Sequence, residues 1–147
     1  MDEEAAIRSL IDERVAAMRE KDAARAVATL APDVVAFELA PPLALEGEAA
    51  RDEAALAAWL AGWEGPVEIE IRDLRVAVSG DVAWSHSLNR LRGTLKGGRI
   101  VDMWMRSTLG FRKLGGQWKI AHGHSSVPFR MDGSYRAATD LVPAGGA

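Results

Sequence analysis

The sequence predicts an α+β domain in which N-terminal helices pack on a strongly curved antiparallel sheet. Three observations predict this class. Apolar residues recur at helical spacing up to residue 63, and from residue 67 onward they alternate. Three glycine-containing turns then divide the second half into runs of strand length. We expect one domain over residues 1–130 and a C-terminal tail over residues 131–147.

Four elements are predicted to be helical, the last a short helix in the C-terminal tail that Ser134 caps and that runs through Leu141. The first spans residues 3–21, where an apolar stripe recurs at helical spacing: Ile7, Leu10, Ile11, Val15 and Met18. Asp22 is a suitable N-cap for a second, short helix. The third spans residues 48–63, and its buried face is expected to hold Leu56, Trp59, Leu60 and Trp63.

Arg14 lies inside the apolar stripe of the first helix. An unpaired buried charge is very costly, so the guanidinium must meet a carboxylate, a carbonyl, water or a bound anion. We expect it to reach a pocket and to pair with Glu38 or with a bound acid. The alternative is that its long side chain extends to solvent.

Strands follow from the remaining patterns. Residues 34–39 form a β-branched and aromatic strand that stops at Pro41 and Pro42. Residues 67–78 form a strand whose apolar phase slips, which predicts a bulge near Arg72 and Asp73. The turns at residues 79–81, 97–98 and 115–116 complete a four-stranded antiparallel meander.

The turns also predict a register. If the glycine pairs at 97–98 and 115–116 both form two-residue turns, His86 and His122 each lie opposite Leu109. All three histidines then fall on the concave face beneath the helices, and a one-residue slip would reverse this. That face is expected to hold Trp84, His86, Leu88, Arg90, Met103, Met105, Ser107, Leu109, Phe111, Trp118, Ile120, His122, His124 and Ser126. The opposite face, with Trp104 and Arg106, suits solvent or a subunit contact, so a homodimer through it is predicted.

The histidines are candidates for proton transfer or ligand contact, because imidazole titrates near neutrality. A satisfied polar cluster at the edge of the core is the plainer alternative, and a three-histidine metal site is a weaker one. No metal or cofactor is expected. Glu38 is a candidate general base if strand alternation fails before Pro41; otherwise it is an exposed charge. Expected ligand contacts are His86, Trp59, Trp63, Met103, Met105, Ser107, Leu109 and Phe37.

Composition limits the possible partners. Hydrophobic residues make up 48% of the 147 residues and charged residues 27%, which is ordinary for a packed domain. The net charge of −3 argues against a nucleic acid or an anionic membrane as partner. There are no cysteines, which excludes disulfides and thiolate chemistry. With no apolar signal or membrane-spanning run, a cytoplasmic location is expected.

Three segments carry a resemblance to a known superfamily: residues 31–38, 102–106 and 116–129. Together they make the chain resemble the nuclear transport factor 2-like superfamily, close to its SnoaL-like and ketosteroid isomerase-like members. The resemblance implies a cystatin-like, cone-shaped fold. It also implies that Glu38 stands where the isomerase has its aspartate base and Arg14 where it has its oxyanion-hole tyrosine. Leu109 replaces the isomerase's second, hydrogen-bonding acid, so true steroid isomerase activity is not expected.

Two functions follow as expectations. The first is a pocket for a small hydrophobic or weakly acidic molecule, with an isomerase, lyase or cyclase reaction that uses Glu38, Arg14, His122 and His124. The second is a non-catalytic module for dimerisation or ligand binding. The fold itself does not decide between them, because one fold can carry unrelated functions.

Overall fold

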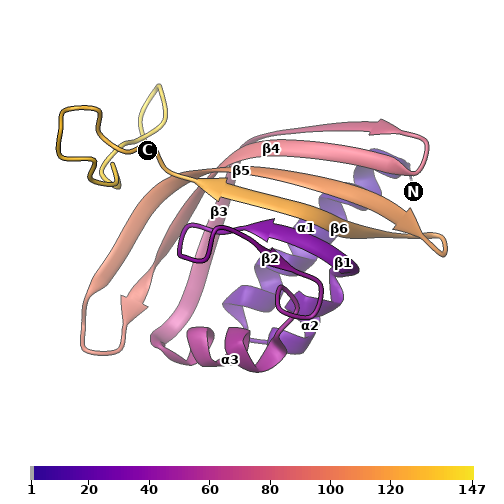
Figure 1. Ribbon diagram of the computed structural model, residues 1–147, viewed down its shortest axis with the longest axis horizontal. Helices are drawn as coiled ribbons and strands as arrows, with labels where there is room; N and C mark the ends of the chain where they lie inside the picture. Colours follow the sequence, from indigo (N-terminus) through magenta and orange to yellow (C-terminus); the bar gives the residue numbers. More distant parts are fainter. Residues whose placement is uncertain (1) are drawn as a thin grey trace.

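The chain folds into helices that cover one face of a curved sheet (Figure 1). The computed structural model describes residues 2–147. The elements are α1 (Glu3–Arg19), α2 (Ala23–Ala28), β1 (Leu30–Phe37), β2 (Leu45–Glu46), α3 (Glu53–Ala61), β3 (Trp63–Ser79), β4 (Val82–Leu95), β5 (Ile100–Leu114) and β6 (Gln117–Ser126). The sheet order is β2-β1-β6-β5-β4-β3, with β1 parallel to β6 and every other pair antiparallel. The predicted α+β class and meander are confirmed.

Aspartate caps fix where each helix begins. The carboxylate of Asp2 accepts a hydrogen bond from the Ala5 amide, and Asp22 and Asp52 do the same for residues 25 and 55. The cap at Asp52 explains why α3 starts five residues later than the sequence pattern predicted. No helix within residues 2–147 is long and apolar enough to cross a membrane.

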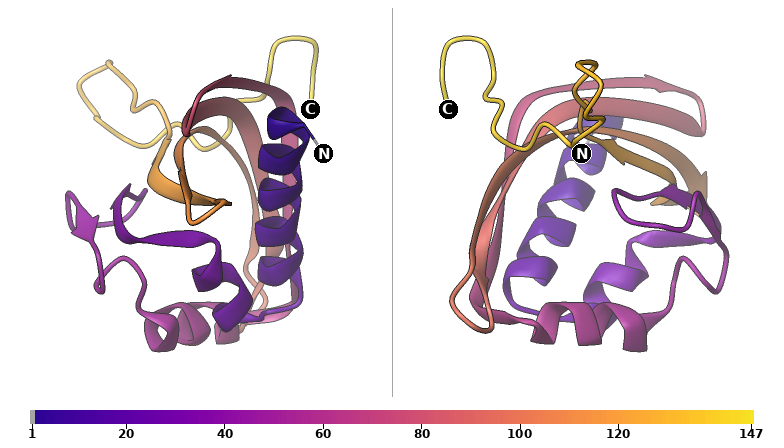
Figure 2. Two further views of the ribbon diagram at one scale, coloured as in Figure 1. Left: turned by 90° about the vertical axis from the view of Figure 1, so that its right-hand side faces the viewer. Right: turned by 60° about the vertical axis from the view of Figure 1, so that its left-hand side comes forward.

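The core consists of two separate clusters, both between the helices and the concave face of the sheet. The first lies near the turn between β5 and β6 and joins α1 to the sheet. Its residues are Ile7, Ile11, Leu30, Val34, Ala83, Phe111, Trp118 and Ile120. The second joins α1, α2 and α3 to β3 through Ala17, Met18, Ala23, Ala26, Leu60, Trp63 and Val67. Figure 2 shows the sheet curving over the helices, with α1 laid across its hollow side. We call this side of the sheet the inner face and the opposite side the outer face.

The register of β4 against β5 differs by one residue from the prediction. His86 pairs with Thr108, and Leu109 pairs with Ser85 instead. The turn is longer than two residues: the Leu95 amide donates to the Arg99 carbonyl, while the Lys96 amide donates to the Gly62 carbonyl at the end of α3. This register directs Leu91 onto the inner face, where it packs on the second cluster, and directs His86 and Trp84 outward.

The predicted turn between β5 and β6 is confirmed, because Leu114 pairs with Gln117. Four pairs later, however, one extra residue enters β6. Phe111 pairs with Ile120 but Gly110 pairs with His122, so Ala121 is the additional residue of a β-bulge. The bulge reverses the facing of everything after it in β6.

A second bulge confirms the sequence reading of β3. The pairing of β3 with β4 shifts between Arg72 and Arg75, and Asp73 adopts a left-handed φ of 56°. The C-terminal tail then returns toward this strand, because the guanidinium of Arg72 donates to the carbonyl of Gly146. The tail is further held by a β-bridge between Phe129 and Ala137. The short helix predicted from Ser134 to Leu141 is wrong, because turns and this bridge occupy the segment.

Candidate functional site

The three histidines share one face of the sheet, but it is the outer face. The prediction that His86, His122 and His124 line the concave face is wrong, because the longer turn reverses β4 and the bulge at Ala121 reverses the end of β6. Two independent one-residue shifts therefore keep the imidazoles together while moving all of them to the other side.

Phe37 accompanies the histidines on the outer face. Its ring meets that of His122 edge-on at 4.8 Å and that of His124 at 5.3 Å between centroids. His122 also bonds through Nδ1 to the Val35 carbonyl at 2.7 Å. Phe37, an expected ligand contact, therefore lies on the outer face, and the core residue of this strand is Val34, which is 2% exposed.

The reversal of β1 changes the position of Glu38. Ala36 pairs with Gly123 and Phe37 with His124, so the register continued by one residue places Glu38 beside Ser125 on the inner side. Its carboxylate is exposed, and its charge partly opposes the lowering of the Arg14 pKa by burial. The extrapolated register therefore puts Glu38 on the inner side, one residue beyond the end of β1.

Arg14 lies on α1 between the two core clusters, after Ile11 of the first and before Met18 of the second. Its Nη1 donates to the Ala26 carbonyl at 3.0 Å and to the Thr29 hydroxyl at 3.4 Å. Burial lowers the pKa of this guanidinium, and the Glu38 charge opposes that effect. Arginine stays protonated in proteins, so Arg14 is a half-buried cation with neutral hydrogen-bond partners.

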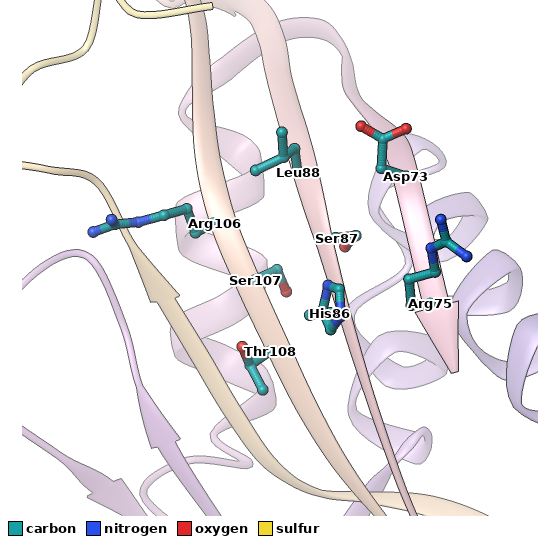
Figure 3. Close-up of a pocket in the computed structure, with 8 residues that line it drawn as sticks. All are labelled: Asp73, Arg75, His86, Ser87, Leu88, Arg106, Ser107 and Thr108. Atoms are coloured by element: carbon teal, nitrogen blue, oxygen red, sulfur yellow. The ribbon is translucent and has the colours of Figure 1, made fainter. Parts of the chain in front are cut away.

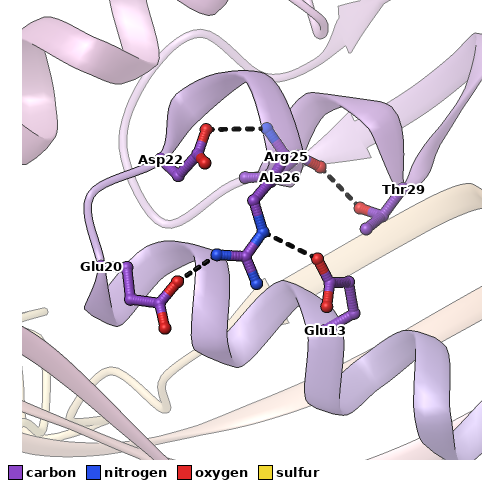
Figure 4. Close-up of polar contacts among 6 residues, drawn as sticks. All are labelled: Glu13, Glu20, Asp22, Arg25, Ala26 and Thr29. Atoms are coloured by element: carbon purple, nitrogen blue, oxygen red, sulfur yellow. Dashed lines mark hydrogen bonds and ion pairs between the residues drawn. The ribbon is translucent and has the colours of Figure 1, made fainter.

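The acceptors of Arg14 are held by the junction of α1 and α2 (Figure 4). Arg25 on α2 donates to Glu13 and to Glu20 on and beside α1, and these hydrogen bonds raise the pKa of its guanidinium. The Thr29 hydroxyl also donates to the Ala26 carbonyl at 2.6 Å. The C-terminal end of α2 is therefore fixed where Arg14 can reach it.

Polar side chains occupy the inner face between the two clusters. Ser87 on β4, Ser107 on β5 and Ser125 on β6 are directly paired, and we call them the serine row. Ser107 is buried, and the Ser87 hydroxyl donates to the Asn89 side chain at 2.7 Å. Extended by one position beyond the last β1–β6 pair, Phe37 with His124, the same register puts Glu38 next to Ser125 of this row.

The remaining predicted contact residues divide between the inner face and α3. Met103, Met105 and Leu109 lie on the inner face and are half-buried. Trp63 is buried in the second cluster, and its Nε1 has no hydrogen-bond partner among the described residues. Trp59 meets Trp63 edge-on at 5.4 Å but is 45% exposed, so its predicted burial is wrong.

Two hollows are evident on the structure, and both involve the outer face. A groove of about 440 Å³ is lined by the eight residues drawn in Figure 3: Asp73, Arg75, His86, Ser87, Leu88, Arg106, Ser107 and Thr108. A smaller hollow of about 180 Å³ lies beside Val82 and Trp84. The cavity expected beneath α1 stays a prediction. Arg75 and Thr108 were not foreseen as groove residues, because the predicted register separated them from His86.

Trp104 does lie on the outer face, but it is buried. Its ring lies between the guanidinium groups of Arg72 and Arg90, each 5.7 Å from the ring centroid. The exposed aromatic side chain of this face is Trp84, at 53%. No group of three or more His, Asp or Glu side chains in residues 2–147 is arranged to hold a metal ion.

Comparison with known proteins gives a consistent family. A family model described as the SnoaL-like domain matches residues 7–130. An NTF2-like protein of unknown function from Pseudomonas putida KT2440 is 34% identical, with a TM-score of 0.82 over 97% of this chain and 99% of that one. A proposed ketosteroid isomerase from Shewanella frigidimarina is 26% identical, with a TM-score of 0.65 over 82% and 94%. An uncharacterised protein with a cystatin-like fold from Caulobacter vibrioides is 19% identical, with a TM-score of 0.69 over 84% and 87%, which shows the fold alone. No curated protein matches.

Proposed function

We propose that the inner face of this protein binds a small, weakly acidic or carbonyl-containing molecule. The premise is that the chain belongs to the SnoaL-like domain family of NTF2-like proteins. The observation that carries this proposal is the division of the core. Between its two apolar clusters lie a cation on α1 and the serine row on the sheet. The carboxylate of Glu38 follows the end of β1, and its charge acts on Arg14.

Each group has a definite role in this proposal. Arg14 binds the oxygen of the ligand, because burial disfavours its charge and its hydrogen-bond partners, the Ala26 carbonyl and the Thr29 hydroxyl, are neutral. The serine row donates or accepts hydrogen bonds along the same molecule, and Met103 and Met105 contact its apolar part. Glu38, one residue beyond the end of β1, accepts a proton in this proposal.

The reaction that suits these groups is proton abstraction next to a carbonyl. The Glu38 carboxylate takes the proton from carbon, the electron pair of that bond moves into the carbonyl, and Arg14 stabilises the negative charge on oxygen. Return of the proton to another carbon gives an isomerisation, and loss of a neighbouring leaving group gives an elimination. His122 and His124 lie on the other face, so the proposed reaction does not use them.

Binding of a phenol tests the role of Arg14. We expect 4-nitrophenol to bind as the phenolate, and its absorbance reports the ionised form directly. Arg14→Met should weaken binding about tenfold, the effect of losing roughly one charged hydrogen bond. Arg19→Met on the same helix is the matched control, because Arg19 is exposed and lies near Glu68 at 3.7 Å. Equal affinity in Arg14→Met and the wild type would refute the proposed contact.

Exchange into deuterated water tests the role of Glu38. The protein should speed deuterium incorporation beside the carbonyl of a cyclic ketone, and Glu38→Gln should abolish that acceleration while 4-nitrophenol still binds. Exchange that persists in Glu38→Gln would remove the proposed base. Exchange absent from the wild type, with phenolate binding intact, would leave a binding protein in place of an enzyme.

Self-association through the outer face is a second candidate function. The observation that favours it is exposure: Val82 and Trp84 are 55% and 53% exposed on neighbouring positions of this face. Because Trp104 is buried, Trp84 and not Trp104 is the aromatic contact we propose. Sedimentation velocity should show a dimer that Trp84→Glu dissociates; a monomer at every concentration would end this proposal.

A further inference from the structure

A line of hydrogen-bond donors crosses the outer face of the sheet. Arg75 on β3 pairs with His86 on β4, His86 pairs with Thr108 on β5, and Thr108 pairs with His124 on β6. Directly paired residues point to the same side, and neighbouring strands are about 4.8 Å apart, so these four side chains form a row roughly 14 Å long. We call them the donor row. All four are exposed.

The donor row is largely unused within the chain. Among the described residues, Arg75 has no ion pair or side-chain hydrogen bond, and the Thr108 hydroxyl has none either. The ring contact of His86 is with Trp84, at 5.3 Å between centroids. Outer-face arginines elsewhere in the sheet are paired, as Arg90 is with Asp102 at 2.8 Å. An unpaired guanidinium beside an imidazole and a hydroxyl is the donor set that a carboxylate prefers.

The groove in Figure 3 contains most of this row. Arg75, His86 and Thr108 line it, and Asp73 is its one carboxylate. Arg106 adds a second cation to the lining, although its head turns toward β6, where Nε donates to the Ser126 hydroxyl at 3.1 Å. The lining therefore carries an excess of positive charge, in a chain whose net charge is −3.

An apolar hollow adjoins the cationic groove. The smaller hollow is lined by Ala77, Val82 and Trp84, and the ring of Trp84 lies against the ring of His86 in the larger one. Gly110 on β5 pairs with Trp84, so β5 presents no side chain beside the indole. A molecule that spans both hollows must be anionic at one end and apolar at the other.

We infer that the outer face binds a small carboxylic acid, with its carboxylate against Arg75, His86 and Thr108 and its apolar body against Trp84. The donors proposed here, Arg75, His86 and Thr108, face the opposite side of the sheet from Arg14 and Glu38 and have no part in the function proposed for those two residues. The groove also borders Ser87 and Ser107 of the serine row, but the proposed carboxylate does not use them. The carboxylate replaces water on donors that have no partner within the chain, and the apolar body covers an exposed indole.

The experiment follows the imidazole resonances of His86 by NMR, assigned with His86→Gln, while 2-naphthoate or octanoate is added to the full chain. The two probes separate a planar apolar body from a flexible one. Arg75→Gln should weaken binding about tenfold, and Thr108→Val about threefold, as expected for loss of a charged and a neutral hydrogen bond. The control is Arg92→Gln, an outer-face arginine of β4 that lies near Glu70 at 3.8 Å, and it should change the affinity less than about twofold.

Three results would overturn the inference. One is an unshifted His86 resonance with both acids. Another is equal affinity in Arg75→Gln and the wild type. The third is inorganic phosphate binding as tightly as either acid, since the apolar hollow would then have no part. Self-association would cover Trp84, so the affinity is measured over a protein dilution series, and Arg14→Met should leave it unchanged.

Discussion

Replacement of Arg14 by methionine should stabilise the protein while removing its ligand contact. Arg14 lies on α1 between Ile11 and Met18, so an apolar side chain of similar length can extend the apolar face of the helix. Burial already disfavours the charged guanidinium and lowers its pKa. Loss of the guanidinium leaves the Ala26 carbonyl satisfied, because the Thr29 hydroxyl still donates to it at 2.6 Å.

The magnitude follows from these contacts. Replacing a buried ion pair by apolar side chains of similar volume is neutral or stabilising by about 1–4 kcal/mol, and Arg14 has only neutral hydrogen-bond partners, so its loss leaves no buried partner charge behind. Arg14 is half-buried and makes two hydrogen bonds that would be lost, so we expect a gain near the lower end, about 1 kcal/mol. For a chain of 147 residues, this is a rise in Tm of roughly 3 °C.

Urea unfolding followed by tryptophan fluorescence measures the change. Arg25→Met is the matched control on the neighbouring helix, because Arg25 is bound by Glu13 and Glu20 and its loss should lower stability. A loss of more than about 2 kcal/mol in Arg14→Met would refute the reasoning. The hydrogen bonds from Arg14 to Ala26 and Thr29 would then serve mainly to hold α2 against α1. The proposed contact between Arg14 and a ligand would lose its main support.

Two further predictions concern the packing of the sheet and the end of α1. Gly93→Ala should lower the free energy of unfolding by about 1–3 kcal/mol, because the added Cβ would lie 2.8 Å from the ring of Trp63. Gly110→Ala is the control and should be nearly neutral, because its added Cβ would have its nearest contact at 3.4 Å. Thermal unfolding measures both, and equal Tm values for the two variants would contradict the packing. Hydrogen bonds from Lys113 and Trp118 hold the pKa of Glu3 below its ordinary value of 4.5. Ionised Glu3 therefore stabilises the folded state at pH values above 4.5, and this stabilisation is lost as the pH falls through the lowered pKa. Glu3→Gln should therefore be less stable than the wild type at neutral pH and converge with it in acid, and a constant difference across a pH series of urea unfolding curves would disprove this.

The parts of the fold that depend on a single segment were predictable from the sequence. The aspartate cap of α2 and the bulge near Asp73 each leave their mark within a few residues: a polar residue before an apolar run, and a slip of the apolar phase. The anomaly of Arg14 within an apolar stripe was visible for the same reason. The sequence pattern does not, however, reveal the two core clusters on either side of it.

Which face each strand presents was not predictable in the same way, because it depends on counting from a turn. Two adjacent glycines suit turns of more than one length, and at 97–98 the choice is decided by a bond from Lys96 to Gly62, far away in sequence. Ala121 has no feature that marks it as the extra residue of a bulge. One unmarked residue in each place was enough to assign His86, His122 and His124 to the wrong side.

The bulge at Ala121 shows that the number of residues in a strand, and not only their identity, determines which side chains face a ligand. If Ala121 entered the ladder opposite Gly110, the last residues of β6 would shift by one position against β5. His122 and His124 would then turn toward the helices, and Gly123 and Ser125 toward solvent. Whether one alanine is counted in the ladder thus decides whether imidazoles or hydroxyls line the inner surface, whereas deletion of Ala121 itself would leave every present pair unchanged.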